Sequence, residues 1–334
     1  MTIQNRSIKF VCLLLLILAV SSRHVFAADK LKALIIDGQN NHDWSHTTPV
    51  MKWILEDSGR FTVDVSTSPS TPPRKPATPK GTVTPEQQAV FDEAMAKWKV
   101  ASEACESAWQ NWHPHFQDYD VVIGNYNGHP WSEAMRKDFV DYVSNGGGFV
   151  SVHAADNSFP EWPEYNEMIG LGGWGNRNEK SGPMLRLREG KFNRDETPGS
   201  GGSHGAQHEF LIVTREPEHP ILKGLPAEWR HATDELYSKL RGPATNLTVL
   251  ATAFAAKEKG GTGEDEPMLM VINFGKGHVF HTTLGHSTNA MLGLGFQITL
   301  ARGAEWVATG KVTLPAPEAG VLGSDKAALR TPKL

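Results

Sequence analysis

Short apolar runs alternate with longer amphipathic stretches through the first half of the chain. Such runs are typical of buried strands, and they occur at 31–37, 61–65, 119–124 and 149–152. Amphipathic stretches at 49–58 and 131–145 predict helices between them. Because alternating strands and helices form parallel sheets covered on both sides, we predict an α/β fold. The expected architecture is a single domain with a doubly wound, mostly parallel, flavodoxin-like sheet and helices on both faces.

Two long segments interrupt this pattern. Residues 69–85 are rich in proline and threonine, and 86–112 is alanine-rich with apolar residues at helical spacing. We therefore expect an insertion over about 66–118 that contains one long helix. Residues 160–207 are dense in glycine and proline and predict long loops of the kind that cover binding sites. Further strands are predicted at 210–214, 248–251 and 268–274, a hairpin and strand at 275–287, and a closing helix at 293–309.

The first 27 residues have the features of a secretory signal peptide. Arg6 and Lys9 precede an apolar run, and Val25 and Ala27 supply the residues that a signal peptidase recognises. We expect cleavage near Ala27 and a secreted or periplasmic protein. No other segment has about 18 consecutive apolar residues, so no stable membrane association is expected. The predicted division is a signal peptide over 1–27, a domain over 28–310 and an extended C-terminal tail over 311–334.

The charge of the chain limits the partners that it can bind, and its cysteine content limits how the fold can be stabilised. The net charge of the whole chain is −4. The charged residues of the predicted signal are all basic, so the mature protein has a more negative net charge. An acidic chain of this kind does not favour binding to nucleic acid. Cys105 is the one cysteine after the signal, which excludes an internal disulfide in the mature protein.

Polar turns follow three of the predicted parallel strands, at 38–46, 125–131 and 153–159. The carboxyl ends of parallel strands meet at one edge of the sheet, where ligands of such folds bind. The third turn comes after a glycine turn and a short strand, and it begins with His153. Enzymes of the α/β class place nucleophiles or bases at sharp bends of this type. The alternative is that His153 only caps a turn at the strand end.

Histidines and carboxylates at the predicted strand ends supply the candidate chemistry. They are His42, Asp43, His46, His153, Asp156, His208, Glu209, Asp234, Glu235, His281 and His286. One interpretation is a divalent metal, zinc or manganese, although no tight motif such as HExxH is present. The metal-ligand candidates are His46, His153, His208 and His281.

The same groups can transfer protons without a metal. A histidine with a pKa near its usual value serves as acid or base, and an adjacent carboxylate can orient it. The predicted catalytic residues are His153, His208, Asp234 and His286. Polar and aromatic residues beside them are predicted to bind substrate, namely Asn41, His42, Asp43, Trp44, Asn127, Asn157, Trp174 and Glu209. Trp44, Trp131, Trp162 and Trp174 could stack on sugar rings, or they could belong to the core.

The order and spacing of several motifs resemble the ThuA-like family, named for trehalose utilisation. The motifs are IIDGQNNHDW at 35–44, NYNG at 125–128, GGGFVSVHAADNSFPEWPEY at 146–165, QHEF at 207–210, HPILKGLP at 219–226, DELY at 234–237 and GKGHVFHTTLGHS at 275–287. The resemblance covers about 32–309 and implies the class I glutamine amidotransferase-like fold. Those amidotransferases carry a nucleophilic cysteine at the position of His153, so a cysteine-based glutaminase is excluded.

The expected function is therefore carbohydrate chemistry without the amidotransferase cysteine. We expect a secreted enzyme that acts on a small carbohydrate or a keto-sugar derivative by isomerisation, elimination or hydrolysis, through His153 and neighbouring groups. The family's association with disaccharide utilisation supports this substrate class. The alternatives are a non-catalytic sugar-binding protein on the same scaffold and a metal-dependent hydrolase of another small substrate.

Overall fold

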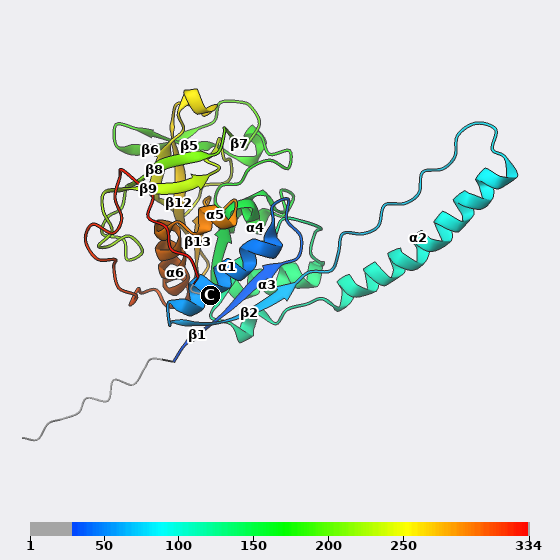
Figure 1. The fold of residues 1–334 in the computed structure, drawn as a ribbon, viewed down its shortest axis with the longest axis horizontal. Coiled ribbons are helices and arrows are strands. Elements are labelled where there is room, and N and C mark those ends of the chain that lie inside the picture. The colour runs from blue at the N-terminus through cyan, green and yellow to red at the C-terminus, as the bar shows by residue number, and fades with distance from the viewer. Residues whose placement is uncertain (1–28, 333–334) are drawn as a thin grey trace, which may run out of the picture.

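A computed structural model describes residues 29–332, and its centre is a nine-stranded mixed sheet (Figure 1). The strands lie in the order β2-β1-β3-β4-β13-β12-β11-β8-β9. The first five run parallel to one another, and each later strand is antiparallel to its neighbour. The parallel strands are β1 (Leu31–Asp37), β2 (Phe61–Thr67), β3 (Val121–Gly124), β4 (Gly148–Val152) and β13 (Gly277–Thr282). The antiparallel extension consists of β12 (Asp265–Phe274), β11 (Leu247–Phe254), β8 (His208–Thr214) and β9 (Glu228–Asp234).

Helices cover both faces of the sheet, which confirms the predicted α/β fold. Alternate residues of β1 divide between two cores, because successive side chains of a strand point to opposite faces. Ala33 and Ile35 join the core that includes side chains of α1 and α6, whereas Leu34 and Ile36 join the core that includes α3 and α4. The helices are α1 (Trp44–Asp57), α3 (Glu133–Ser144), α4 (Pro163–Ile169), the short α5 (Thr288–Met291) and α6 (Leu294–Thr309).

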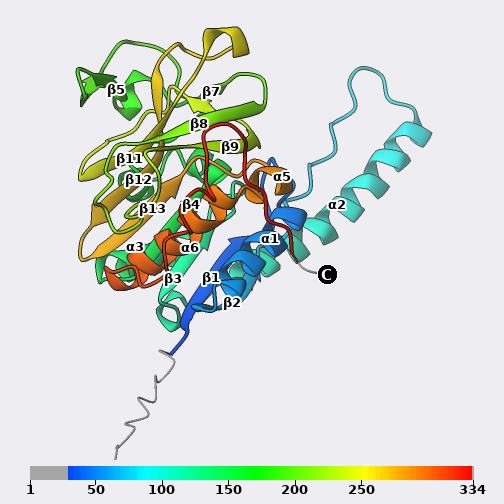
Figure 2. The ribbon, with the colours of Figure 1, turned by 60° about the vertical axis from the view of Figure 1, so that its left-hand side comes forward.

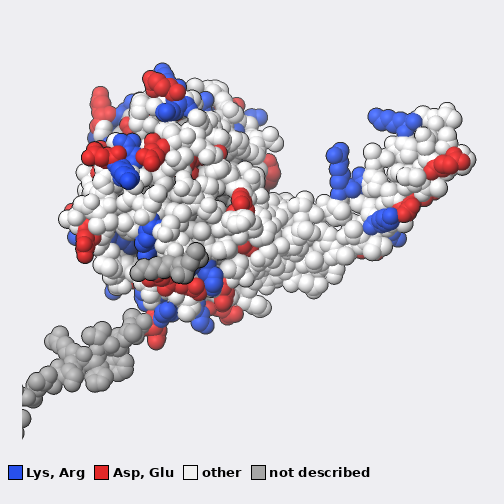
Figure 3. All heavy atoms as spheres, in the orientation of Figure 1, with Lys and Arg blue, Asp and Glu red and all other residues white. Residues whose placement is uncertain are grey.

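The segment between β2 and β3 forms an arm that extends away from the body (Figures 1 and 2). Its main element is α2 (Pro85–Asn111), which begins with a capping box between Thr84 and Gln87. The extended segment that leads from β2 to α2 packs beside α2, and Trp109 Nε1 donates to the Ser70 carbonyl at 3.1 Å. Acidic and basic side chains are intermingled on the face of the molecule shown in Figure 3.

The long segment 160–207 contains small elements that build one wall of the site described below. The antiparallel pair β5 (Met184–Arg188) and β6 (Lys191–Asp195) forms a hairpin, and β7 (Ser203–His204) pairs with β10 (Tyr237–Ser238). The same segment contains the short 3₁₀ helix η3 (Glu179–Ser181). The other short 3₁₀ helices lie elsewhere in the chain and are η1 (Phe116–Asp118), η2 (His153–Asn157) and η4 (Lys257–Lys259).

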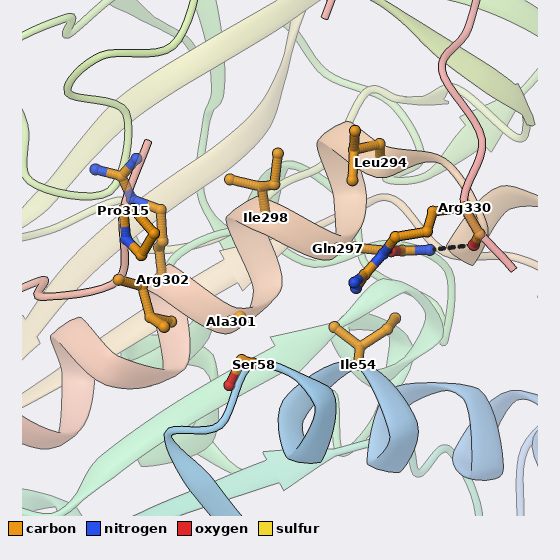
Figure 4. Close-up of a pocket in the computed structure, with 10 residues that line it drawn as sticks. Ile54, Ser58, Leu294, Gln297, Ile298, Ala301, Arg302, Pro315 and Arg330 are labelled. Carbon is orange, nitrogen blue, oxygen red and sulfur yellow. Dashed lines mark hydrogen bonds between the residues drawn. The ribbon is translucent and has the colours of Figure 1, made fainter. Parts of the chain in front are cut away.

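The chain after Gly310 contains no helix or strand through residue 332, and it packs back on α1 and α6. Gln297 Nε2 donates to the Arg330 carbonyl at 2.8 Å (Figure 4). A cavity of about 230 Å³ lies under this tail, and neither a histidine nor a carboxylate lines it. The tail cavity therefore lacks the groups that acid–base or metal chemistry requires.

The predicted signal peptide lies outside the described residues. No helix within 29–332 has both the length and the apolar character needed to cross a membrane.

Glu305 joins the start of the tail to α6 and β2, and its removal should destabilise the protein. The buried carboxylate accepts hydrogen bonds from Arg60 Nε at 2.9 Å, Thr313 N at 2.8 Å and Leu314 N at 3.0 Å. Glu305→Ala leaves these donors without their acceptor, and we expect it to lower the free energy of unfolding by about 3 kcal/mol. Urea unfolding measures the change. The exposed Glu318 supplies the control Glu318→Ala, and equal stability of the two variants would contradict the role of Glu305.

Candidate functional site

His153 stands at the bend that follows β4, with its ring in a fixed orientation. Its backbone φ is 47°, a value uncommon for a residue other than glycine, and its side chain is buried. Ring Nδ1 lies 2.7 Å from the carbonyl oxygen of Thr283, the residue after β13. A carbonyl can only accept, so Nδ1 carries the hydrogen and donates it. Nε2 is buried and has no hydrogen-bond partner within the described chain.

His42 reaches the same place from the loop after β1. The loop leaves the strand at Gly38, whose φ of 105° and close approach to Ser68 exclude a side chain. Asn40 Oδ1 accepts from the backbone N of His42 at 3.0 Å and lies 3.2 Å from its ring Nδ1. Asn40 is itself held by Asn125 at the end of β3, at 3.2 Å between Nδ2 and Oδ1. The ring of His42 is thus oriented with Nε2 toward the end of β4.

The carboxylate of Glu235 lies among four histidines. It follows directly after β9, and its side chain is 9% exposed. Its Oε2 is 3.7 Å from Nε2 of both His42 and His153, and its Oε1 is 3.2 Å from Nε2 of His286 and 3.7 Å from Nε2 of His204. This group of five side chains, called the Glu235 cluster below, draws on both halves of the chain.

Asp234, the residue before Glu235, positions the cluster without lining it. Its fully buried carboxylate accepts from His231 Nε2 at 2.8 Å and from the backbone N of Glu235 at 2.8 Å. It also accepts from the backbone N of Gly285 at 2.8 Å and of His286 at 3.1 Å. One carboxylate therefore fixes the end of β9 to the loop that carries His286.

The Glu235 cluster borders a cavity of about 540 Å³. Its aromatic wall is formed by Trp174 and Tyr237, whose ring centroids are 4.6 Å apart. Asparagine side chains line another part, and Asn127 Nδ2 donates to Asn41 Oδ1 at 2.7 Å. The lining residues are Asn41, His42, Asn127, Asn157, Trp174, Gly175, His204, Glu235, Tyr237 and His286. The cavity therefore combines the flat apolar faces of two aromatic rings with amide groups and titratable groups.

Burial and mutual interaction shift the pKa values inside the cluster. Burial raises the pKa of Glu235, but the nearby His153 and His42, and the charge of His286, outweigh that effect and hold the pKa far below its usual range. Burial is the largest single effect on the pKa of His153 and lowers it, but Glu235, the charges of Asp234 and Asp156 and the Thr283 carbonyl together outweigh burial and leave that pKa raised. The pKa of His286 is lowered, chiefly by burial. The cluster therefore holds Glu235 in its ionised form.

Comparison with known proteins identifies the family. The family model ThuA, described as trehalose utilisation, matches residues 77–307. A ThuA-like protein of known crystal structure from Parabacteroides merdae is 40% identical, with a TM-score of 0.77 over 90% of this chain and 98% of that one. The chain belongs to the ThuA family. A ThuA-like protein from Bacteroides uniformis, 18% identical, has a TM-score of 0.51 over 86% of this chain and 95% of that one, which shows the shared fold. No curated protein matched.

In this ThuA-family protein, seven of the residues predicted to form the site meet at the cavity. His153 belongs to the Glu235 cluster, and the others line the cavity, namely Asn41, His42, Asn127, Asn157, Trp174 and His286. Cys105, by contrast, is buried in α2 and lies outside the cavity lining.

The metal-ligand set proposed from the sequence is not gathered in one place. Of its four members, His153 alone belongs to the Glu235 cluster. His46 is exposed, with Nδ1 2.7 Å from Asp43 Oδ2. His281 is buried on β13, with Nδ1 2.9 Å from the Ile169 carbonyl and Nε2 3.2 Å from Asp156 Oδ2. His208 lies at the start of β8, with Nδ1 2.7 Å from the Ala206 carbonyl, and is not among the lining residues.

Other predicted substrate contacts also lie elsewhere. Asp43 is the residue before α1 and interacts with Ser45 and His46. Trp44 begins α1, and Glu209 is an exposed residue of β8; neither lines the cavity. Trp131 and Trp162, the other two tryptophans considered for stacking, are buried in the core that includes α3 and α4.

Three residues of the cavity were absent from the predicted set. Glu235 was a candidate, but the sequence reasoning chose its neighbour Asp234 as the catalytic carboxylate. Tyr237 was named within the DELY motif without a role. His204 lies in the glycine-rich stretch before β8, and it reaches the cavity because β7 pairs with β10, placing His204 opposite Tyr237. A two-residue pairing of this kind leaves no periodic signal in the sequence.

Asp234→Asn should loosen the cluster and destabilise the fold. An amide would present a donor to groups that already donate, so at least one of the four hydrogen bonds is lost. We expect the free energy of unfolding to fall by about 2–3 kcal/mol, measured by urea unfolding. Backbone amide NMR signals of Gly285 and His286 should shift. The exposed Asp118 gives the control Asp118→Asn, and unchanged amide signals in Asp234→Asn would refute the positioning role.

Proposed function

We propose that this ThuA-family protein is a secreted or periplasmic enzyme that processes a carbohydrate or keto-sugar derivative at the Glu235 cluster. The observation that carries the proposal is the placement of an ionised carboxylate and three histidines in the lining of a cavity, with His153 buried beside them, where the cavity also has an aromatic wall and amide groups. The trehalose utilisation described for the family supports a carbohydrate as the substrate class.

The walls of the cavity suit a sugar. A sugar ring offers an apolar face to aromatic side chains and hydroxyl groups to amides, and Trp174, Tyr237 and the asparagines provide both kinds of surface. Asn157 Oδ1 is buried and lacks a hydrogen-bond partner among the described residues, so it is free to accept from a substrate hydroxyl. A cavity of about 540 Å³ is within the size range of small-molecule sites.

The cluster is equipped for proton transfer next to a carbonyl. In a keto-sugar, removal of the proton on the carbon beside the carbonyl gives an enolate. Isomerisation returns the proton to a different atom, whereas elimination breaks the glycosidic C–O bond as a C=C bond forms and the leaving oxygen takes up a proton. His286 is the proposed proton acceptor, because it borders the cavity and lies 3.2 Å from Glu235, which orients it. In an elimination, His286 then passes the proton that it has accepted to the leaving oxygen.

The alternative function is sugar binding without catalysis. The aromatic wall and the asparagines by themselves would serve a binding protein, and this alternative assigns no chemical role to the histidines.

Variants of the cluster should lose turnover. Glu235→Gln and His286→Gln remove the orienting carboxylate and the proton acceptor, and each should lower kcat at least about 100-fold. The assay measures product formation from trehalose, other disaccharides and the corresponding keto-glycosides. His115 is exposed and lies outside the cavity lining, so His115→Ala serves as the control with unchanged kcat. Full turnover in both cluster variants would exclude catalysis by these groups.

Trp174→Ala should weaken substrate binding more than catalysis. Loss of one stacking surface is expected to raise KM about tenfold with kcat nearly unchanged, and Trp174→Phe should restore most of the affinity. Trp98 in the arm gives the control Trp98→Ala. If wild-type protein binds a sugar by calorimetry, turns over none of the panel and loses affinity in Trp174→Ala but not in Glu235→Gln, the binding alternative replaces the enzyme.

A further inference from the structure

Three ring nitrogens in the Glu235 cluster point lone pairs toward a carboxylate. His42, His153 and His204 each place Nδ1 beside an oxygen that can only accept, namely Asn40 Oδ1 and the carbonyls of Thr283 and Gly205, at 3.2, 2.7 and 2.9 Å. Nδ1 must therefore carry the hydrogen of a neutral ring, which leaves Nε2 as an acceptor. All three Nε2 atoms face Glu235 at 3.7 Å, and a carboxylate donates nothing in return. With neutral rings, three lone pairs and a carboxylate face one another here, and a bound cation would remove their mutual repulsion.

We propose that His42, His153 and Glu235 bind one divalent transition metal ion through the two Nε2 atoms and Oε2. One ligand atom from each of the three side chains lies within 4.8 Å of the others, and Nε2 of each histidine is 3.7 Å from Oε2. Ligand atoms on a tetrahedral ion at bond lengths near 2.1 Å lie about 3.4 Å apart, so only a small inward movement is needed. The site concerns the same cluster as the proposed function, and it can be tested without a substrate.

The surroundings have the features expected around a metal ligand. A metal-bound histidine usually donates its other ring hydrogen to a carbonyl or amide oxygen, which fixes the ring and its tautomer. Asn40 provides that contact for His42, and Thr283 provides it for His153. The buried, unpartnered Nε2 of His153 is explained in the same way, because an ion supplies the partner that the described chain lacks.

Two histidines and one carboxylate leave at least one coordination position open. His₂Glu sets of this kind hold catalytic zinc, and related 2-His-1-carboxylate sets hold iron, so zinc, manganese, iron and cobalt are the ions to test. Since His42 and Glu235 line the cavity, the open position faces it, where a water, hydroxyl or carbonyl oxygen of a sugar would bind. His286 lies beside the other carboxylate oxygen, 3.2 Å from Oε1, and stays available for proton transfer.

The test measures metal bound by the protein directly. Mature protein is loaded with zinc, manganese, iron(II) or cobalt, dialysed against metal-free buffer and analysed by mass spectrometry, with affinity obtained by competition with a chromogenic chelator. We expect about one ion per chain in the wild type and loss of that ion in His42→Ala and Glu235→Gln. The exposed His46 is four residues from His42 and supplies the matched control His46→Ala, which should keep the ion.

Two further readouts separate a lost ligand from a misfolded protein. Asn40→Ala keeps every ligand and removes the support of His42 together with the contact between Asn40 and Asn125, so it should lower the affinity about 10–100-fold. Cobalt in the wild-type site should give the visible absorption of a four- or five-coordinate ion, and His42→Ala should abolish it while its circular dichroism stays native.

The outcomes for the metal and for the enzyme are distinguishable. Stoichiometric metal lost in the ligand variants, without turnover of any sugar, supports the metal site and contradicts the proposed enzyme. Turnover by wild-type protein that retains none of the four ions supports the enzyme and overturns the metal site. Failure of the wild type to retain any of the four ions, or retention by His42→Ala and Glu235→Gln, also overturns it.

Discussion

The carboxylate of Asp234 holds together the parts of the molecule on which the site depends. It is fully buried and receives one side-chain and three backbone hydrogen bonds. Those donors come from β9 and from the loop after β13, which are separated by three strands in the sheet order. A charge so buried is stable only when its acceptor sites are filled, so the loop can adopt few other paths. The positions of Glu235 and His286 follow from this constraint.

The mixed sheet explains why a residue beyond the parallel half reaches the site. β13 is parallel to β4, and four successive antiparallel pairings bring β11, after the second, and β9, after the fourth, into the same direction. The carboxyl end of β9 therefore faces the same edge as those of β1, β3 and β4, where ligands of α/β proteins bind. Glu235 extends that rule to an edge strand, β9, whose one neighbour in the sheet, β8, is antiparallel to it.

Sequence reasoning succeeded where a local pattern determines the structure. The strand-end turns predicted His153, His42 and the asparagines, because the carboxyl ends of parallel strands share one edge whatever the detailed loop path. It did not separate Asp234 from Glu235, since adjacent acids after a strand look alike until their hydrogen-bond donors are known. The position of His204 depends on the pairing of two-residue strands. The orientations of His208, beside Ala206, and of His281, beside Ile169 and Asp156, depend on contacts that sequence spacing does not reveal. The ThuA resemblance fixed the fold but left these contacts open.

The separation of the cluster residues along the chain has a consequence for when the site comes into existence. The five cluster residues lie on five different loops or strand ends, and any two of them are at least 31 residues apart in the sequence. A chain that has not yet completed its sheet therefore has no partial site with which to capture an ion. If the proposed ion is bound, its identity would therefore depend on the ions present where folding finishes rather than on those present where the chain is made.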